Sequence, residues 1–384
     1  MEREPIRALA RALAASLGLA AAPALAQLPT TITPDLFPFP GSHFSPASSF
    51  SAGRAVADRW LGDEPFDNPS ASGPPKLELT PVRLNVSRQD LRADHRSYTE
   101  NSANFDAAGG FASLAMGKMG LALYGYQPVL RIEDNSFLTG SLIGPSGSVK
   151  SSSEAREFRG GLALSLGRGR ARFGIAGEWT HRADHYERAE DTGALVVNTY
   201  VADFSGEAAG GQAGVRVTVG EGERSVVLGG ALRYMAELPL TGTETLSGAA
   251  GTSTNALSTR RDAGWEGGLS ARYLATKAFH VLAGVGGRSE QKYQGWGVAS
   301  GRGLEWSLAG EYHDDRDPWT LRFGLGQEQQ NGVPEPRAGV VGLGFGFRLD
   351  STVLDLGVLH RTFERPDHPN STDDHILLSL VQEF

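Results

Sequence analysis

Two histidines four residues apart, His181 and His185, are the first candidates for chemistry in this sequence. On a helix this spacing places two metal ligands on one face. The residues around them, however, alternate between large apolar and small or polar types with a period of two, which predicts a strand. On a strand the two side chains share a face but lie about 13 Å apart, too far to bind one ion. We therefore expect no metal site.

A second group with reactive side chains, Asp373-Asp374-His375, opens the last alternating run of the chain. A barrel hydrolase would use such groups together with a serine and an asparagine on adjacent strands. The chain has nine histidines and many carboxylates in polar segments, so chance proximity of these types is expected. Gly-x-Gly strings such as 342–344 precede no helix, which argues against a nucleotide site. The sequence predicts neither an enzyme nor a cofactor.

The composition narrows the class of protein. The chain has 384 residues with 50 Gly and no Cys, which excludes a disulfide scaffold, a Cys-ligated zinc site and thiol catalysis. Residues 1–26 have the basic start, apolar run and Ala-x-Ala end of a secretory signal peptide. Without the three Arg and two Glu of that segment, 33 basic and 42 acidic residues remain. We expect an exported, acidic protein that does not bind nucleic acid.

From Lys76 to the C-terminus the sequence alternates with the period of two that is typical of strands. The runs, each 11 to 17 residues long, are 76–88, 105–115, 119–132, 154–166, 170–186, 206–219, 224–237, 260–273, 278–292, 302–312, 319–329, 336–347, 352–364 and 373–384. Crossing a bilayer needs about 9–11 residues, whereas soluble strands average about 5–6. Links between the earlier runs are alternately long and short, as in outer-membrane barrels. We predict an all-β, antiparallel up-and-down transmembrane barrel of about fourteen strands; the alternative is a soluble sandwich or barrel.

The two faces of these runs differ in chemistry. One face carries Leu, Val, Ile, Phe and Trp and suits outer-membrane lipid, while the other carries Arg, Glu, Thr, Ala and Gly and suits a lumen. The chain ends in an amphipathic run with Phe384 as its last residue. Such an ending matches the signal that the barrel-assembly machinery recognises, so we expect this machinery as a partner.

Short stretches of the sequence resemble one family of barrels. The segments 51–55 (SAGRA) and 67–71 (DNPSA) resemble the plug region of FadL-type transporters, although Ser70 stands where that family usually has Ala. Segment 119–128 resembles the third strand of the family, and 318–361 resembles its closing strands. The resemblance implies a fourteen-stranded barrel with an N-terminal plug that takes fatty acids or aromatic hydrocarbons across the outer membrane. It also implies a lateral gap at the third strand.

The resemblance and the local sequence together assign gate and plug residues. Asn68, Pro69, Ser70 and Ala71 would hold the plug against the third-strand wall, although Asn68-Pro69 is equally a plain turn. Pro128 has no N–H and would leave a ladder position unpaired in the third strand. Alternatively, Pro128 lies near the outer rim, beyond the hydrocarbon.

Aromatic residues are dense in the irregular segment that precedes the first run. Residues 51–61 can form a short helix, and four prolines between 65 and 75 exclude a long one. The aromatic residues either line an apolar cargo site or anchor the plug in the lumen; they are Phe37, Phe39, Phe44, Phe50 and Phe66.

These observations predict three parts: a signal peptide at 1–26, a plug at 27–75 and a barrel at 76–384. The predicted function is passive uptake of small hydrophobic compounds through the bacterial outer membrane, with the cargo leaving by a lateral gap near the third strand. Two other functions remain open, a barrel scaffold or secretion-accessory protein that presents its outer loops to partner proteins, and an outer-membrane hydrolase.

Overall fold

The computed structural model describes most of the chain after residue 46. The described ranges are 47–72, 75–93, 96–138, 148–191, 197–221, 225–248, 251–294, 298–300, 302–313, 317–330, 337–364 and 371–384. The predicted signal peptide and the first twenty residues of the predicted plug therefore lie outside the described residues. None of the helices in these ranges combines the length and the apolar character that a membrane crossing requires.

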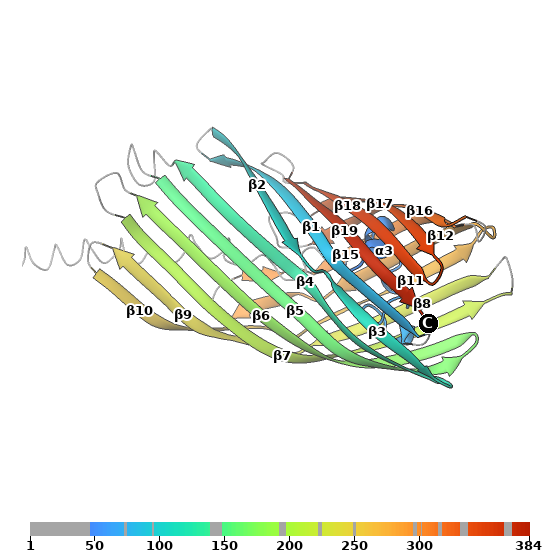
Figure 1. Ribbon diagram of the computed structural model, residues 1–384. Coiled ribbons are helices and arrows are strands. Elements are labelled where there is room, and N and C mark those ends of the chain that lie inside the picture. The colour runs from blue at the N-terminus through green and yellow to red at the C-terminus, as the bar shows by residue number, and fades with distance from the viewer. Residues whose placement is uncertain are drawn as a thin grey trace, which may run out of the picture.

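The described residues form a closed antiparallel barrel of fourteen strands, five of which are interrupted once (Figure 1). Its last strand pairs with its first, from Lys76 opposite Glu383 to Arg88 opposite Thr372, and this ladder closes the barrel. Each of the fourteen predicted runs lies on one strand. In chain order the strands are β1 (Lys76–Ala93), β2 (Arg96–Asp106) with β3 (Gly109–Met116), β4 (Met119–Leu138), β5 (Ser148–Arg168), β6 (Ala171–Asp191), β7 (Val197–Val219), β8 (Val226–Met235) with β9 (Leu238–Gly248), β10 (Gly251–Arg261) with β11 (Gly264–Leu274), β12 (Phe279–Arg288) with β13 (Gln291–Gln294), β14 (Val298–Ser300) with β15 (Gly303–His313), β16 (Trp319–Gln330), β17 (Arg337–Leu349), β18 (Thr352–Glu364) and β19 (Ser371–Glu383).

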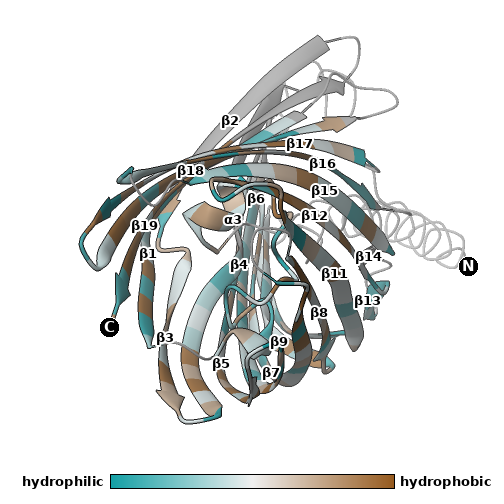
Figure 2. Cartoon of the chain, turned by 90° about the vertical axis from the view of Figure 1, so that its right-hand side faces the viewer, coloured by the Kyte–Doolittle hydropathy of each residue, from teal (hydrophilic) through white to brown (hydrophobic). Residues whose placement is uncertain are grey.

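The two faces of the wall have opposite chemistry, as the alternation predicts. Large apolar side chains point outward; Ile175 is 63 % exposed and Leu269 is 64 % exposed. The largest fully buried side chains include five arginines of the wall, Arg83, Arg182, Arg233, Arg261 and Arg361. Figure 2 shows the resulting alternation of apolar and polar bands along the strands. An apolar outside and a charged inside define a transmembrane barrel.

Segments that the sequence predicts as long loops are strands. The predicted link 238–259 is the hairpin of β9 and β10, and β7 begins at Val197 rather than at residue 206. Side-chain pairs such as Thr245 with Thr254, 3.1 Å apart, join β9 to β10. The outward face of these extensions is mostly polar, since they continue beyond the apolar belt, while their inward face contributes to a buried apolar cluster. They consequently lack the outward apolar face on which the prediction depends.

The backbone ladder between the second and third strands stops halfway. β3 pairs with β4 from Met116 opposite Met119 to Gly109 opposite Tyr126. Farther along, β2 pairs with β1 and the rest of β4 pairs with β5, but within the described ranges no register joins β2 to β4. The β4–β5 register shifts between Tyr126 and Val129. Pro128 lies buried in this bulge, at the point where the ladder ends.

Residues 47–72, which we call the plug, lie inside the barrel. They begin with helix α3 (Ser49–Gly53), which the ring of strands surrounds in Figure 2. The predicted helix over 51–61 is wrong in its extent, because α3 ends at Gly53. Ala55 and Val56 have φ angles of +49° and +57°, which a right-handed helix does not allow. The plug ends with the 3₁₀ turn η1 (Pro69–Ala71).

The plug follows the inner wall closely, and inward-facing glycines make the space for it. A Cβ atom on any of these glycines would collide with the plug. Along the plug they are Gly357 on β18 at Ser49, Gly342 on β17 at Ala52, Gly324 on β16 at Arg54, Gly284 on β12 at Ala57, Gly229 on β8 at Leu61, Gly214 on β7 at Asn68, Gly174 on β6 at Pro69 and Gly120 on β4 at Ser72. The plug thus runs around the lumen and meets the wall strands in descending order.

Two glycines of β6 on opposite faces of the wall test this arrangement. In Gly174→Val the new side chain meets the backbone of Pro69 and Ser70, so we expect the plug to undock at a cost of about 1–3 kcal/mol. In Gly177→Val it meets nothing within 4 Å, so docking should be unchanged. Trypsin cleavage of the plug, with heat-modifiable gel migration as the check on barrel folding, measures both. Equal cleavage of the two variants would contradict the close contact.

Candidate functional site

Asn68 anchors the plug through its side-chain amide. Its Nδ2 donates to the carbonyl oxygens of Trp60 (2.9 Å), Val215 on β7 (3.2 Å) and Gly230 on β8 (3.2 Å). Its Oδ1 accepts from the backbone N–H of Ser70 at 3.0 Å and caps η1. The expectation that Asn68 faces the third-strand wall is therefore wrong, because the carbonyls that it reaches belong to the sixth and seventh strands. The prediction of a turn at Asn68-Pro69 is confirmed, because Asn68 caps η1 through Oδ1 while its Nδ2 contacts the wall.

The three residues after Asn68 form the turn that carries the chain back to the wall. Pro69 opens η1, where its missing N–H costs no hydrogen bond, and its backbone packs against Gly174. The Oγ atom of Ser70 is buried and has no hydrogen-bond partner in the structure. Just beyond Ala71, the carbonyl of Ser72 accepts a hydrogen bond from the side chain of Ser165 on β5. The motif 68–71 is therefore a plug anchor that contacts several strands.

Charged side chains of the plug form ion pairs with the wall, a feature that the sequence analysis missed. Arg54 contacts Glu311 on β15, with Nε 2.9 Å from Oε2, and also pairs with Asp58 at 2.5 Å. Arg59 lies 3.3 Å from Glu305, also on β15. Burial alone would lower the pKa of Arg54, but Glu311 and Asp58 raise it well above its ordinary value. These arginines remain charged and hold the plug electrostatically.

Asp63 forms the opposite kind of anchor, a plug carboxylate between wall arginines. It pairs with Arg216 on β7 at 3.1 Å and contacts Arg272 on β11. Burial would raise the pKa of Asp63, but the guanidiniums of Arg272 and Arg216 hold it well below its usual range. The sequence signal for these contacts was the density of charged residues in 54–63, a short segment that prolines keep from forming a long helix. Their partners, however, lie more than 150 residues away in the sequence.

Two other plug carboxyls lie in surroundings that disfavour their charge. Burial, with Glu78 next in importance, raises the pKa of Glu64 well above its ordinary value, and the hydroxyl of Ser48 donates to Glu64. Burial also raises the pKa of Asp67 to about 7, although Arg59 opposes this rise. Protonation of these two carboxyls is therefore easier in the docked plug than in solution, although Asp67 also lies 3.7 Å from Arg59.

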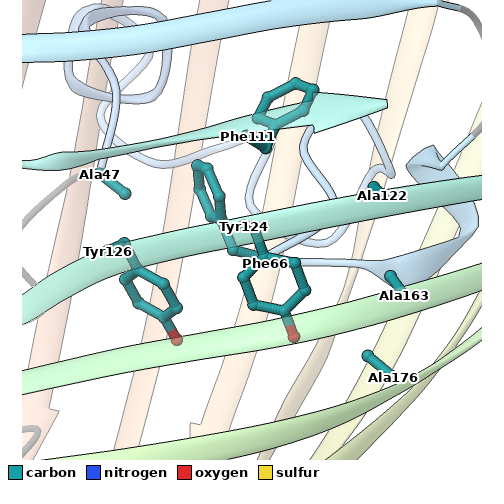
Figure 3. Close-up of a cluster of buried hydrophobic side chains, with 8 residues drawn as sticks. All are labelled: Ala47, Phe66, Phe111, Ala122, Tyr124, Tyr126, Ala163 and Ala176. Carbon is teal, nitrogen blue, oxygen red and sulfur yellow. The ribbon is translucent and has the colours of Figure 1, made fainter. Parts of the chain in front are cut away.

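Phe66 lies in a buried cluster of aromatic rings beside the end of the interrupted ladder (Figure 3). Its ring centroid is 5.3 Å from that of Tyr126, 6.0 Å from Phe111 and 6.4 Å from Tyr124. We call these four residues the aromatic cluster. Small residues around it complete the packing, namely Ala47, Ala122, Ala163 and Ala176. The cluster provides an apolar surface inside a lumen that also holds many charged side chains. A separate buried apolar cluster consists of Tyr186, Ala202, Phe204, Leu238, Leu240 and Tyr293.

Phe50, another of the predicted aromatic residues, occupies a different environment. It is half-buried, and the guanidinium of Arg322 lies 4.6 Å from its ring centroid. The ammonium of Lys76 lies 5.7 Å from the Phe50 ring and 5.1 Å from the Phe111 ring. Phe50 is thus placed for cation–π contacts rather than within the aromatic cluster. Three further predicted positions, Phe37, Phe39 and Phe44, lie outside the described residues.

Arg83 on β1 spans the place where the ladder is lost, a role that no motif around it indicates. Its Nε donates to Asp106, the last residue of β2, at 2.9 Å. Its Nη1 donates to the carbonyl of Gln127, beside Pro128, also at 2.9 Å. The backbone N–H of Gln127 in turn bonds to the carbonyl of Ala108 at 2.9 Å. A buried guanidinium therefore links the bulge of β4 to the end of β2.

The histidines with apparent catalytic or metal-binding spacing have other partners. His181 and His185 share the outward face of β6, as predicted, and pair with Glu207 at 3.4 Å and Asp203 at 2.6 Å. The hydrogen-bond partners of His375 in the described ranges are Asn85, Arg361 and Asp373, so the serine expected of a barrel hydrolase is not among them. Over those same ranges, no three His, Asp or Glu side chains gather in a way that could hold a metal ion.

Asn68→Asp tests the amide anchor with almost no change of shape. It places a carboxylate against three carbonyl oxygens, so we expect docking of the plug to weaken by about 2–4 kcal/mol. Single-channel conductance in planar bilayers should rise. Ser70→Ala is the matched control, because it removes a hydroxyl that has no partner and should leave conductance unchanged. Unchanged conductance in Asn68→Asp would contradict the role of Asn68.

The raised pKa of Asp67 predicts that docking depends on pH. The docked plug binds this proton more tightly than a released plug, whose Asp has a pKa of about 3.9. Docking is therefore tightest below about pH 4 and loses up to about 1.4 kcal/mol per pH unit towards pH 7. Plug cleavage by an added protease, compared at pH 5 and pH 8, should show this. Asp67→Asn should make the profile less steep, with Glu64 contributing the remainder, and Glu221→Gln in an exposed turn should leave it unchanged.

Comparison with known proteins agrees with this architecture. No protein-family model matches the chain, and no curated protein sequence matches it significantly. Among solved structures, a FadL homologue of Pseudomonas aeruginosa has a TM-score of 0.69 at 13 % identity, covering 89 % of this chain and 99 % of its own.

Two transporters described by their cargo are also similar. The Pseudomonas putida toluene transporter TodX has a TM-score of 0.62 at 16 % identity, covering 89 % of this chain and 98 % of its own. The Ralstonia pickettii toluene transporter TbuX has a TM-score of 0.61 at 12 % identity, covering 88 % and 98 %. Across almost their entire length, these structures share the barrel described above. This chain therefore has the plugged, fourteen-stranded barrel fold of the FadL-type outer-membrane transporters.

Proposed function

We propose that this protein is an outer-membrane channel for passive uptake of small hydrophobic compounds. The observation that carries the proposal is the position of the aromatic cluster, whose wall residues Phe111, Tyr124 and Tyr126 belong to β3 and β4 where their ladder ends. An apolar compound that reaches Phe66 would bind by burial of surface, at about 25 cal/mol per Å². Passive movement of such a compound down its own concentration gradient needs no cofactor and no energy source.

The cargo leaves sideways through the interrupted wall between β2 and β4. Nine residues of β4 separate Pro128 from Met119, which corresponds to about 23 Å along the barrel axis at a tilt of about 40°. That height is within an apolar belt of about 25 Å, so the exit opens to hydrocarbon rather than to water. Pro128 keeps the ladder open, and Arg83 holds its two ends in place.

The charges around the aromatic cluster favour a neutral cargo over a fatty-acid anion. The nearest cations already have carboxylate partners: Lys76 pairs with Glu78 at 2.8 Å, and Arg233 pairs with Glu178 at 2.8 Å. Glu64 adds a further buried carboxyl, whose charge is already disfavoured. An incoming carboxylate would be desolvated without a counter-ion, which costs several kcal/mol. We therefore propose that uncharged aromatic hydrocarbons are a better cargo for this protein than fatty acids.

Phe384 fits the proposal that the barrel-assembly machinery reads the C-terminal strand. Its side chain is 80 % exposed at the end of the chain, and its backbone N–H bonds to the carbonyl of Pro75 at 3.4 Å. The terminal ring is thus available to a partner during assembly, before β19 closes onto β1.

A reversible staple across the interrupted wall tests the lateral exit. Continued without the one-residue shift of the β4 bulge, the β3–β4 register places residue 105 opposite residue 130, so the pair Phe105→Cys and Leu130→Cys is chosen to bridge the gap when oxidised. The chain has no native Cys to interfere. We expect uptake of a radiolabelled monoaromatic hydrocarbon by whole cells to fall about tenfold on oxidation and to return with reductant.

A staple lower in the same wall is the matched control. Leu114 and Leu121 already face each other in the β3–β4 ladder, so Leu114→Cys with Leu121→Cys should form a disulfide without changing uptake. Loss of uptake in both oxidised proteins would indicate a general effect of the bridge. Normal uptake with the gap stapled would overturn the lateral exit.

A comparison of the binding of toluene and laurate tests the preference for neutral cargo. Toluene should bind to the purified barrel and quench its tryptophan fluorescence, and Phe66→Ala should weaken this binding about tenfold or more. Laurate at pH 8 should bind more weakly than toluene. Tighter binding of laurate would refute the charge argument, whereas binding of neither compound would refute the uptake function.

A further inference from the structure

A polar groove of about 440 Å³ lies on the outward face of β5, β6, β7 and β9. The alternation of burial shows which side it occupies. On β7, Ala202 and Phe204 are buried inside the barrel, whereas Asp203 and Ser205 between and beside them are exposed. The groove is therefore separate from the lumen and from the aromatic cluster.

Strand register arranges the outward side chains of the groove in two rows. One row consists of Glu154, His185, Asp203 and Thr243, each opposite the next on the neighbouring strand. The second row, one step nearer the membrane, consists of Arg156, Ala183, Ser205 and Thr241. Small side chains in the middle of the second row, with longer ones around them, leave the hollow.

The groove lies just beyond the apolar belt. The last large apolar residue on the outward face of β6 is Trp179, which is 43 % exposed and stacks on His181 with ring centroids 5.8 Å apart. His185 follows Trp179 by six residues, which is about 15 Å along the barrel axis for a strand tilted by about 40°. Trp at such a boundary marks the edge of the hydrocarbon. Phospholipid headgroups extend only about 5–8 Å beyond the hydrocarbon on each side. The groove thus lies at a height that only a larger headgroup reaches.

The side chains of the groove offer many hydrogen bonds and little net charge. Asp203 pairs with His185 at 2.6 Å, and Glu154 pairs with Arg156. The hydroxyls of Ser205, Thr241 and Thr243 line the opposite side. Two carboxylates against one arginine disfavour a phosphate, whereas alternating donors and acceptors match a ring of hydroxyl groups.

We propose that this groove binds the sugar headgroup of a glycolipid in the outer leaflet. Phe158 and Trp179 lie directly below the groove, with ring centroids 6.2 Å apart, and provide an outward apolar surface along which the acyl chains of the same lipid would run. The sugar would sit over Ala183, and the two rows would bind its hydroxyls. This inference rests on the proposed outer-membrane location but not on the cargo or on its exit.

Retention of lipid by the intact barrel tests the proposal. The protein is reconstituted in nanodiscs of phosphatidylethanolamine and phosphatidylglycerol with lipopolysaccharide, and the lipid that remains bound is counted by native mass spectrometry. Ala183→Trp fills the hollow and should lower the affinity for lipopolysaccharide about tenfold. Thr252→Trp, an exposed residue at the tip of the β9–β10 hairpin, is the matched control and should retain it.

A water-soluble competitor shows whether the sugar or the acyl chains of the glycolipid are recognised. De-acylated lipopolysaccharide should displace the bound glycolipid, because the proposal assigns recognition to the sugar. Failure of this competitor, equal retention in Ala183→Trp, or retention of phosphatidylglycerol instead would each overturn the proposal. Uptake of toluene by Ala183→Trp in whole cells should stay at the level of the unmodified protein. The two proposals therefore fail independently.

Discussion

The structure depends on one constraint, which is that every charged side chain in the membrane-spanning part of the wall must point into the lumen. The hydrocarbon outside excludes charge, so wall residues flanked by outward apolar side chains, such as Arg233 and Arg322, are buried inside the barrel. A buried charge is costly unless it is paired. Arg261 pairs with Glu157 at 2.7 Å, and Arg182 approaches the same carboxylate at 3.4 Å. The interior is therefore a network of ion pairs, and the plug is part of it.

The plug supplies ion-pair and hydrogen-bond partners to charged residues on several wall strands. Arg54 and Arg59 neutralise carboxylates of β15, while Asp63 neutralises arginines of β7 and β11. Backbone carbonyls of the plug also accept from the wall, as Phe66 does from Arg233 and Asp67 from Gln212. Removal of the whole plug would take the Asp63 carboxylate from Arg216 and Arg272. It would also take Arg54 from Glu311, which would keep Arg322 as its partner. The spread of these contacts over several strands favours a local rearrangement of the plug over its complete release.

The sequence was sufficient to predict the strands of the barrel, but it was not sufficient to predict the contacts between the plug and the inner wall. Alternation over long runs predicts all fourteen strands because lipid imposes apolar side chains on one face. The same signal fails where the wall rises beyond the lipid, and the hairpin of β9 and β10 was consequently expected to be a loop. The motif at Asn68 indicated an anchor, but its wall partners Val215 and Gly230 contribute only backbone carbonyls, which carry no residue signature. Arg83 likewise acquires its role from strand register alone.

The interrupted ladder follows from the same demand that polar groups be satisfied. Backbone groups left unpaired between β2 and β4 are tolerable in a membrane only if protein groups replace the lost ladder. Arg83 does this on one side by donating to the carbonyl of Gln127, and Ala108 does it on the other by accepting from the Gln127 N–H. Pro128 has no N–H to satisfy. The aromatic cluster then covers the inner side of this position with apolar surface. The wall is therefore open in its backbone ladder at this position but held together by side-chain and aromatic contacts, which is the feature on which the proposed lateral exit rests.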